Sequence, residues 1–292
     1  MTTIAINPNQ PLFQQPSVPY ITNTEYVNAP TSVDVSELVV GGTTAQESQE
    51  LSRVIARACA VIDNWLNQTL TATSQTAVQI ARVKEDGTVT LRIDNSPILE
   101  LTAASFQTDL MDPNPANYTA LDCSKALINR QTVTLGYTAG LTLSPGVKAR
   151  FQTTVVAGYP NTTLSVAATA GASSITVANA LGLYTGSQMA FFDDTGGYEQ
   201  CVVSGMPVGN VVSLASPLQF AHGVGVAFSG LPESIKEAAI LVTNVLIRTR
   251  GSEALVLGSL TGVPSVQKGD PANATDLTIA KSILSDFKRV WT

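Results

Sequence analysis

Charged residues are scarce in this 292-residue sequence. Asp, Glu, Lys and Arg make up 13% of it, about half the usual share, and 16 basic against 22 acidic residues leave a net charge of -6. Binding nucleic acid through its phosphates needs dense groups of Lys and Arg, and no such group occurs. The composition therefore argues against a protein that binds DNA through its phosphates. The low charged fraction is also typical of proteins in assemblies, whose surfaces are partly covered by neighbouring subunits.

Histidine and cysteine are scarce as well. The sequence has one histidine, His222, and three widely separated cysteines, Cys59, Cys123 and Cys201. This spacing predicts neither a disulfide framework nor a metal site, and a reducing compartment is the simplest fit. Histidine-dependent catalysis would have to use His222 within a turn, so we favour a structural or exposed histidine. Cys59 lies among apolar residues, which predicts a buried and inert thiol.

Long apolar runs are also missing. The longest, such as residues 238–242, are too short to cross a bilayer, and the first 17 residues lack the basic and apolar regions of a signal peptide. Gly41 and Gly42 are not followed by the Lys and Ser or Thr of a phosphate-binding loop. Residues 193–197 carry two aspartates but no closing glutamate, which favours a turn over a calcium loop. We therefore expect no cofactor and no metal.

Three segments have helical periodicity. In residues 44–70 apolar side chains recur every three or four positions, and Thr44 with Glu47 fits a capping box at the start. A second helix is predicted to begin around residues 231–234, with its proline near the first turn, and to end near Gly251. It should supply the apolar partner surface that the first helix needs. A third helix is predicted from about residue 273.

The remaining segments are rich in β-branched residues. Residues 76–83 and 88–93 flank Asp86–Gly87, a strong hairpin signal, and further strands are predicted at 97–102, 126–129 paired with 132–137, and 147–156. Residues 163–229 alternate short β-branched runs with Gly, Ser and Asn, a pattern typical of a small all-β barrel or sandwich. We therefore predict an α+β fold: a small helical bundle with a β-hairpin or sheet region, plus an inserted all-β domain.

Three domains follow from this order: an extended N-terminal arm at 1–40, a helical domain with its hairpin region at 41–160 and 231–292, and the inserted β domain at 161–230. The first 30 residues contain five prolines, which resist regular structure. The segment is also more apolar than a simple spacer needs to be, with residues such as Tyr20 and Tyr26. Both a disordered terminus and an arm that becomes ordered on a partner therefore stay open.

The order of the elements carries a resemblance. The segments concerned are 62–66 (IDNWL) at the end of the first helix, 96–99 (SPIL), 157–159 (AGY), 231–239 (LPESIKEAA) and the last helix at 280–290. Together they resemble the head-tail connector (adaptor, or head completion) proteins of tailed bacteriophages. The likeness covers roughly residues 20–160 and 231–291. The β insert between the AGY and LPESIKEAA segments departs from the family and implies an added surface module.

This resemblance implies a structural virion protein rather than an enzyme. Such proteins form a ring, commonly of twelve copies, in the phage neck. The ring joins the portal protein to a stopper or tail component and lets DNA pass without specific binding, after assembly in the host cytoplasm. The resemblance further implies that the last segment docks on the portal or a neighbouring subunit while the arm wraps a neighbour. The partner-binding candidates are Tyr20, Tyr26, Lys281, Lys288, Arg289 and Trp291.

Two alternatives stay open. The protein could be another virion or adhesion component whose β insert binds a glycan or receptor, for which exposed aromatic residues would be the sign. The candidates there are Tyr184, Phe191, Phe192 and Tyr198. A hydrolase is the weakest reading because the sequence offers no convincing general base. Ring size, the face that meets the portal, and the phage and host stay open as well.

Overall fold

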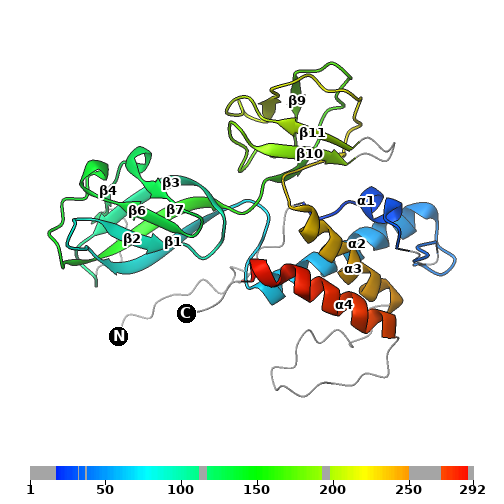
Figure 1. Ribbon diagram of the computed structural model, residues 1–292, viewed down its shortest axis with the longest axis horizontal. Coiled ribbons are helices and arrows are strands. Elements are labelled where there is room, and N and C mark those ends of the chain that lie inside the picture. The colour runs from blue at the N-terminus through cyan, green and yellow to red at the C-terminus, as the bar shows by residue number, and fades with distance from the viewer. Residues whose placement is uncertain are drawn as a thin grey trace. The chain divides into compact units, whose positions relative to one another are not determined.

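The computed structural model describes residues 18–31, 33–36, 38–111, 117–192, 198–249 and 271–288 (Figure 1). The chain divides into two compact units. The first combines Met1–Thr69 with Asn161–Thr292, and the second is Leu70–Pro160. Among the described residues, α-helices occur in the first unit and antiparallel sheets in both, so the fold is α+β; the second unit also has two 3-10 helices, Cys123–Lys125 and Tyr137–Ala139. The division into an arm, a helical domain and an inserted β domain stays a prediction.

The longest helix, α2 (Thr44–Leu66), has the predicted apolar stripe on its buried side. Its cap differs by one residue from the expected one. The Thr43 hydroxyl accepts a hydrogen bond from the Gln46 backbone N–H at 3.4 Å, and the Gln46 side chain accepts one from the Thr43 N–H at 2.8 Å. Glutamine satisfies the reciprocal box as well as glutamate does, which shifts the start by one position. Asn67 then ends the helix in the left-handed conformation, with φ of 57°.

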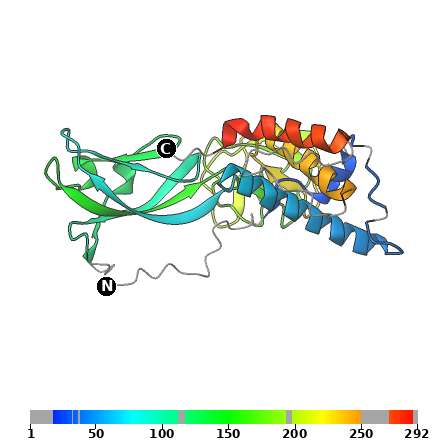
Figure 2. The ribbon, with the colours of Figure 1, turned by 90° about the horizontal axis from the view of Figure 1, so that it is seen from below.

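Two further helices complete the bundle with α2. They are α3 (Glu233–Arg248) and α4 (Pro271–Leu284). The predicted apolar face of α3 is confirmed as buried, and α3 contacts both α2 and α4. An ion pair of 3.2 Å joins Arg248 near the end of α3 to Asp276 near the start of α4. Helices α2 and α4 therefore run in one direction and α3 in the other (Figures 1 and 2).

Part of the expected arm is helical. Residues Asn23–Asn28 form the short helix α1, where the prolines around them predict extended chain. The physical reason is local: Thr22 and Glu25 make a complete capping box, which satisfies the first free backbone N–H groups. Tyr20, Ile21 and Tyr26 are buried, so apolar burial adds to this local stabilisation.

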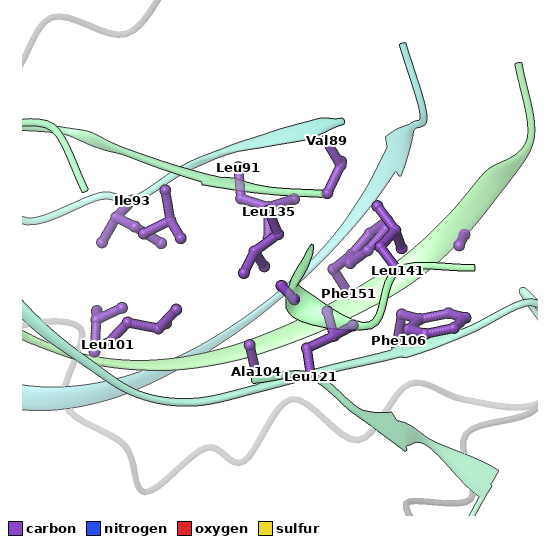
Figure 3. Close-up of a cluster of buried hydrophobic side chains, with 14 of the residues drawn as sticks. Val89, Leu91, Ile93, Leu101, Ala104, Phe106, Leu121, Leu135, Leu141 and Phe151 are labelled. Atoms are coloured by element: carbon purple, nitrogen blue, oxygen red, sulfur yellow. The ribbon is translucent and has the colours of Figure 1, made fainter. Parts of the chain in front are cut away.

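The Leu70–Pro160 unit consists of two sheets around one core (Figure 3). The strands of the first sheet, in the spatial order β1-β7-β3-β4, are β1 (Thr73–Arg82), β7 (Lys148–Ala157), β3 (Ile98–Gln107) and β4 (Thr119–Ala120). Those of the second, in the order β2-β6-β5, are β2 (Val89–Arg92), β6 (Thr132–Leu135) and β5 (Leu127–Ile128). The side chains of Phe106, Phe151, Leu91 and Leu135 meet between them.

The hairpin predicted around Asp86–Gly87 is wrong in its pairing. The turn itself is present, since the Lys84 N–H donates to the Thr88 carbonyl at 2.7 Å and Gly87 has φ of +74°. However, β1 pairs with β7 over ten residues, and β2 pairs with β6. A full-length partner offers β1 more ladder hydrogen bonds than the four-residue β2 does. The predicted pairing of 126–129 with 132–137 is confirmed by β5 and β6.

Residues 161–230 form short antiparallel strands, as predicted. Four of them, in the order β11-β10-β13-β8, are β11 (Tyr198–Val202), β10 (Gln188–Phe192), β13 (Ala227–Ser229) and β8 (Asn161–Thr163). A second pair is β9 (Ser174–Thr176) with β12 (Val211–Ser213). In the described part of this segment the strand pairing does not close into a barrel, and neither the barrel nor the sandwich is confirmed. The core is built around Phe191, Val212 and Phe228.

Candidate functional site

Tyr20 and Tyr26 are buried within their own chain. The Tyr20 hydroxyl donates a hydrogen bond to the Asp63 carboxylate, and the Tyr20 N–H donates to Cys59 Sγ at 3.3 Å. The Tyr26 hydroxyl donates to Asn244 Oδ1 at 2.6 Å, and burial raises the pKa of Tyr26 to about 12. Both tyrosines thus anchor the segment around α1 to α2 and α3. Their predicted role in binding a partner stays a prediction.

Asp63 is an acidic residue of α2 that lies in the core of the helical unit. Its side chain is 1% exposed, and burial raises its pKa to about 7, against the opposing effect of hydrogen bonds from Tyr20 and Thr69. The available signal was its position four residues after Cys59 and next to Ile62, on the edge of the apolar stripe. The helix therefore carries a carboxyl group inside the core.

A second charged group is buried between α1 and α3. Lys236 Nζ lies 2.5 Å from Glu25 Oε1, with side-chain exposures of 5% and 8%, and 3.1 Å from the centroid of the Phe192 ring. Burial lowers the pKa of Lys236, while the Glu25 carboxylate opposes that shift. The cation is therefore neutralised by a carboxylate and an aromatic face. A pocket of about 240 Å³ opens beside it, lined in part by Ile21, Tyr198 and Glu233.

A larger hollow, which we call the α1 groove, lies on the other side of α1. It has a volume of about 430 Å³ and is lined by α1, by residues 35–36 and by the first two turns of α2. The lining residues are Asn23, Thr24, Val27, Asn28, Val35, Ser36, Thr44, Glu47, Ser48 and Leu51. Val27 is 56% exposed and Leu51 is buried. Among these residues Glu47 alone carries a charge, so the groove is partly apolar and has one negatively charged side chain.

The basic candidates lie around α4. Lys281 is partly exposed, and Lys288 is exposed with its Nζ 4.9 Å from the centroid of the Trp65 ring. The Gln68 side chain donates to the Phe287 carbonyl at 2.5 Å, which fixes this part of the chain at the C-terminal end of α2. Arg289 and Trp291 lie outside the described residues. The structure thus places Lys288 at the opposite end of the bundle from the α1 groove.

His222 is a buried structural residue. Its Nε2 lies 3.1 Å from Glu199 Oε2, and its ring stacks on Phe191 with centroids 4.1 Å apart. Glu199 also accepts the backbone N–H groups of Gln219 and Phe220, at 2.6 and 3.2 Å. Burial alone would raise the pKa of Glu199, but these hydrogen bonds outweigh it and hold the pKa below its usual value. The pair ties β11 to the turn before β13.

The cysteines and the aromatic candidates complete the survey. Cys59 is buried, and burial raises its pKa to about 12, which agrees with the inert thiol expected there. Tyr184 and Tyr198 are exposed, whereas Phe191 belongs to the core. Within the described ranges no group of three or more His, Cys, Asp and Glu side chains is arranged to hold a metal. In the same ranges no helix combines the length and apolar character needed to cross a membrane.

No protein-family model matches the sequence, and neither does any curated protein. Among solved structures, the chain is similar to one from the neck of an empty GTA particle, computed with C6 symmetry. The identity is 13%, the match covers 93% of this chain and 95% of the other, and the TM-score is 0.39. A TM-score below 0.5 does not establish a shared fold, so the function has to be argued from the chain's own residues.

Proposed function

We propose that this protein is a structural component of a tailed-phage neck, a connector that forms a ring between portal and tail. The supporting observation is the way the segments behind the family resemblance come together. Two of them, residues 96–99 and 157–159, are far apart in sequence but meet, together with residues 70–72, in one hydrogen-bonded junction where the chain enters and leaves the Leu70–Pro160 unit. A resemblance carried by unrelated stretches of ordinary helix and strand would not be expected to converge in this way.

The junction is built from backbone groups. The Tyr159 N–H donates to the Leu70 carbonyl at 2.6 Å, the Ala72 N–H donates to the Tyr159 carbonyl at 2.7 Å, and the Gly158 N–H donates to the Pro97 carbonyl at 2.8 Å. Gly158 has φ of +112°, and a Cβ there would lie 2.4 Å from the Thr71 oxygen. Only glycine fits this position, so the AGY segment has a structural reason for its sequence.

The proposed assembly is a homo-oligomeric ring, of twelve copies by the family resemblance, at the head-tail interface of the virion. Portal protein would bind one side and a stopper or tail-terminator protein the other. The net charge of -6 suits a lumen through which DNA slides, because an acidic surface gains nothing from counterion release. In this proposal the role is structural rather than catalytic, and the 161–230 segment adds an outer surface.

The partner contacts proposed for this ring use Lys281, Lys288, Arg289 and Trp291 on and after α4. Tyr20 and Tyr26 would act by fixing the arm on its own bundle, so that the arm reaches a neighbour from a defined point. Their hydrogen bonds to Asp63 and Asn244 support that role.

Native mass spectrometry of the full chain, alone and mixed with candidate portal, tests the proposal. We expect a closed ring to form with portal present, and we expect deletion of residues 273–292 to abolish portal binding. A chain that stays monomeric with every portal and tail component of its phage would refute the ring. A deletion variant that still binds portal would refute docking of the last segment on the portal and would leave a contact with a neighbouring subunit as its role.

A glycan- or receptor-binding role is the second candidate, favoured by the exposed rings of Tyr184 and Tyr198, at 45% and 51%. Aromatic faces of this kind can stack on sugar rings. A glycan array probed with the full chain tests it: binding that is lost in the Tyr198→Ala variant, together with a persistent monomer, would favour this role over the connector.

A further inference from the structure

We propose that the α1 groove receives residues 289–292 of a second copy of this chain, so that neighbouring copies join head to tail. The inference rests on the proposed ring and names the contact that would link its subunits. It depends on three features: the chemistry of the groove, the composition of the incoming segment, and the distance between the two within one copy.

The groove is a preformed site with an acidic edge. Asn23 Nδ2 donates to the Ser48 carbonyl at 2.8 Å and to the Ser52 hydroxyl at 2.9 Å, which holds α1 against α2 and fixes the width of the groove. Val27 is exposed on one wall, and Leu51 lies at the base. Glu47 supplies a negative charge, and the described residues that line the groove include no cation. The groove is therefore suited to an apolar segment that carries positive charge.

Residues 288–292, with the sequence KRVWT, have that composition. Two adjacent cations, Lys288 and Arg289, precede a valine and a tryptophan. Tryptophan and arginine are the side chains most often responsible for affinity at protein interfaces. Residues 1–17 are a poorer match, because they contain no charged side chain to pair with Glu47. Charge complementarity thus favours the segment after α4 as the occupant.

Within one copy the segment cannot reach the groove. Phe287 is held by Gln68 and Lys288 lies over Trp65, both at the C-terminal end of α2. The groove lies at the N-terminal end, around Glu47 and Leu51. Fourteen residues of helix separate Leu51 from Trp65, which is about 21 Å, whereas the three residues from 288 to 291 span at most about 11 Å. Figures 1 and 2 show α1 and the end of α4 at opposite ends of the bundle.

The contact must therefore form between copies, and it joins different surfaces of each. Such a heterologous contact repeats from copy to copy and either closes into a ring or grows into a filament. A two-fold dimer would instead exchange the segment reciprocally, each copy filling the groove of the other, and a chain with both cysteine changes would then stop at a two-chain product. The α1 groove and residues 289–292 thus supply the kind of interface that a ring requires.

Disulfide cross-linking of the full chain tests this geometry. In a Cys123→Ser background, where the remaining Cys59 and Cys201 are buried, one chain carries Val27→Cys and another Thr292→Cys. Mixing and oxidising them should give a two-chain product, and a chain with both changes should give a ladder of longer products. Val78→Cys is the matched control, because Val78 is 57% exposed but lies in the other unit. It should give no product with Thr292→Cys.

Other results would overturn the inference. A product within a single chain, or none, would exclude docking between copies. A product between Val27→Cys and Phe13→Cys, with none from Thr292→Cys, would show that residues 1–17 occupy the groove instead. Native mass spectrometry with portal distinguishes failure of the groove contact from failure of the ring. A ring that forms although Val27→Cys and Thr292→Cys do not cross-link refutes only the groove contact. If neither the ring nor the cross-linked product forms, the proposed ring is refuted as well.

A charge exchange gives an independent measurement. Glu47→Lys should slow cross-linking by roughly tenfold, because Arg289 of the incoming segment would then meet a cation instead of a carboxylate. Adding Arg289→Glu should restore much of the rate. Glu237→Lys, an exposed change on α3 away from the groove, should leave the rate unchanged. Equal rates for Glu47→Lys and Glu237→Lys would refute the role of the acidic edge.

Discussion

Asp63 makes the stability of the helical unit depend on pH near neutrality. The carboxyl is 1% exposed and its pKa in the folded chain is about 7, against a usual value of 3.8. Between these two values the folded chain binds a proton that the unfolded chain has released. The stabilisation is therefore complete below about pH 3.8 and is lost as the pH rises through 7.

The size of the effect follows from the shift. About three pKa units at roughly 1.4 kcal/mol each give a loss of about 4 kcal/mol between pH 4 and pH 8. Asp63→Asn removes the ionisable group and keeps an oxygen to accept the Tyr20 hydroxyl. We expect this variant to be more stable than the natural protein by up to about 4 kcal/mol at pH 8, and nearly equal to it at pH 4.

Urea denaturation at pH 4, 6 and 8, followed by tryptophan fluorescence, measures this difference. Comparing the two proteins at each pH cancels the contributions of all other titrating groups. Tyr20→Phe is a useful second variant, because losing a hydrogen bond that lowers the pKa of Asp63 should move the pH-dependent loss to higher pH. A stability difference between Asp63→Asn and the natural protein that does not grow from pH 4 to pH 8 would refute the reasoning.

Three further outcomes are expected in the same denaturation assay. Lys236→Met alone should cost about 3–5 kcal/mol, because it leaves Glu25 buried and unpaired, and adding Glu25→Gln should recover most of this; equal costs for the single and double variants would contradict the pairing. Gly158→Ala should cost more than about 3 kcal/mol, since its Cβ would clash with backbone, whereas Gly87→Ala, with positive φ but open space, should cost only about 1–2; similar costs would exclude the clash as the cause. Glu199→Gln should be less stable than the natural protein at pH 7, and the gap should narrow as the pH falls below 4.5, because the ionised form is the one the fold stabilises; a gap that does not narrow below pH 4.5 would argue against it.

Local sequence patterns are enough to predict several of the local elements. The spacing of apolar residues in α2 and α3 predicts their buried faces, because helical periodicity depends only on neighbours within one or two turns. The turn at Asp86–Gly87 formed for the same local reason. The partner of β1 could not be predicted in this way. Its pairing with β7, some seventy residues further along, depends on which long strand the folded chain brings alongside.

The chemistry of the candidate sites depends on contacts between residues that are distant in sequence. Glu25 and Lys236 are 211 residues apart in sequence, and Tyr20 reaches Asp63 across 43 residues, so no local pattern links either pair. The α1 groove exists because a six-residue helix in a proline-rich segment packs beside the start of α2. Buried charged groups, ion pairs and grooves form where separate helices and strands meet, whereas apolar periodicity and capping depend on residues within one helix or strand. For that reason the sequence predicts helices α2 and α3 well and the sites formed between elements poorly.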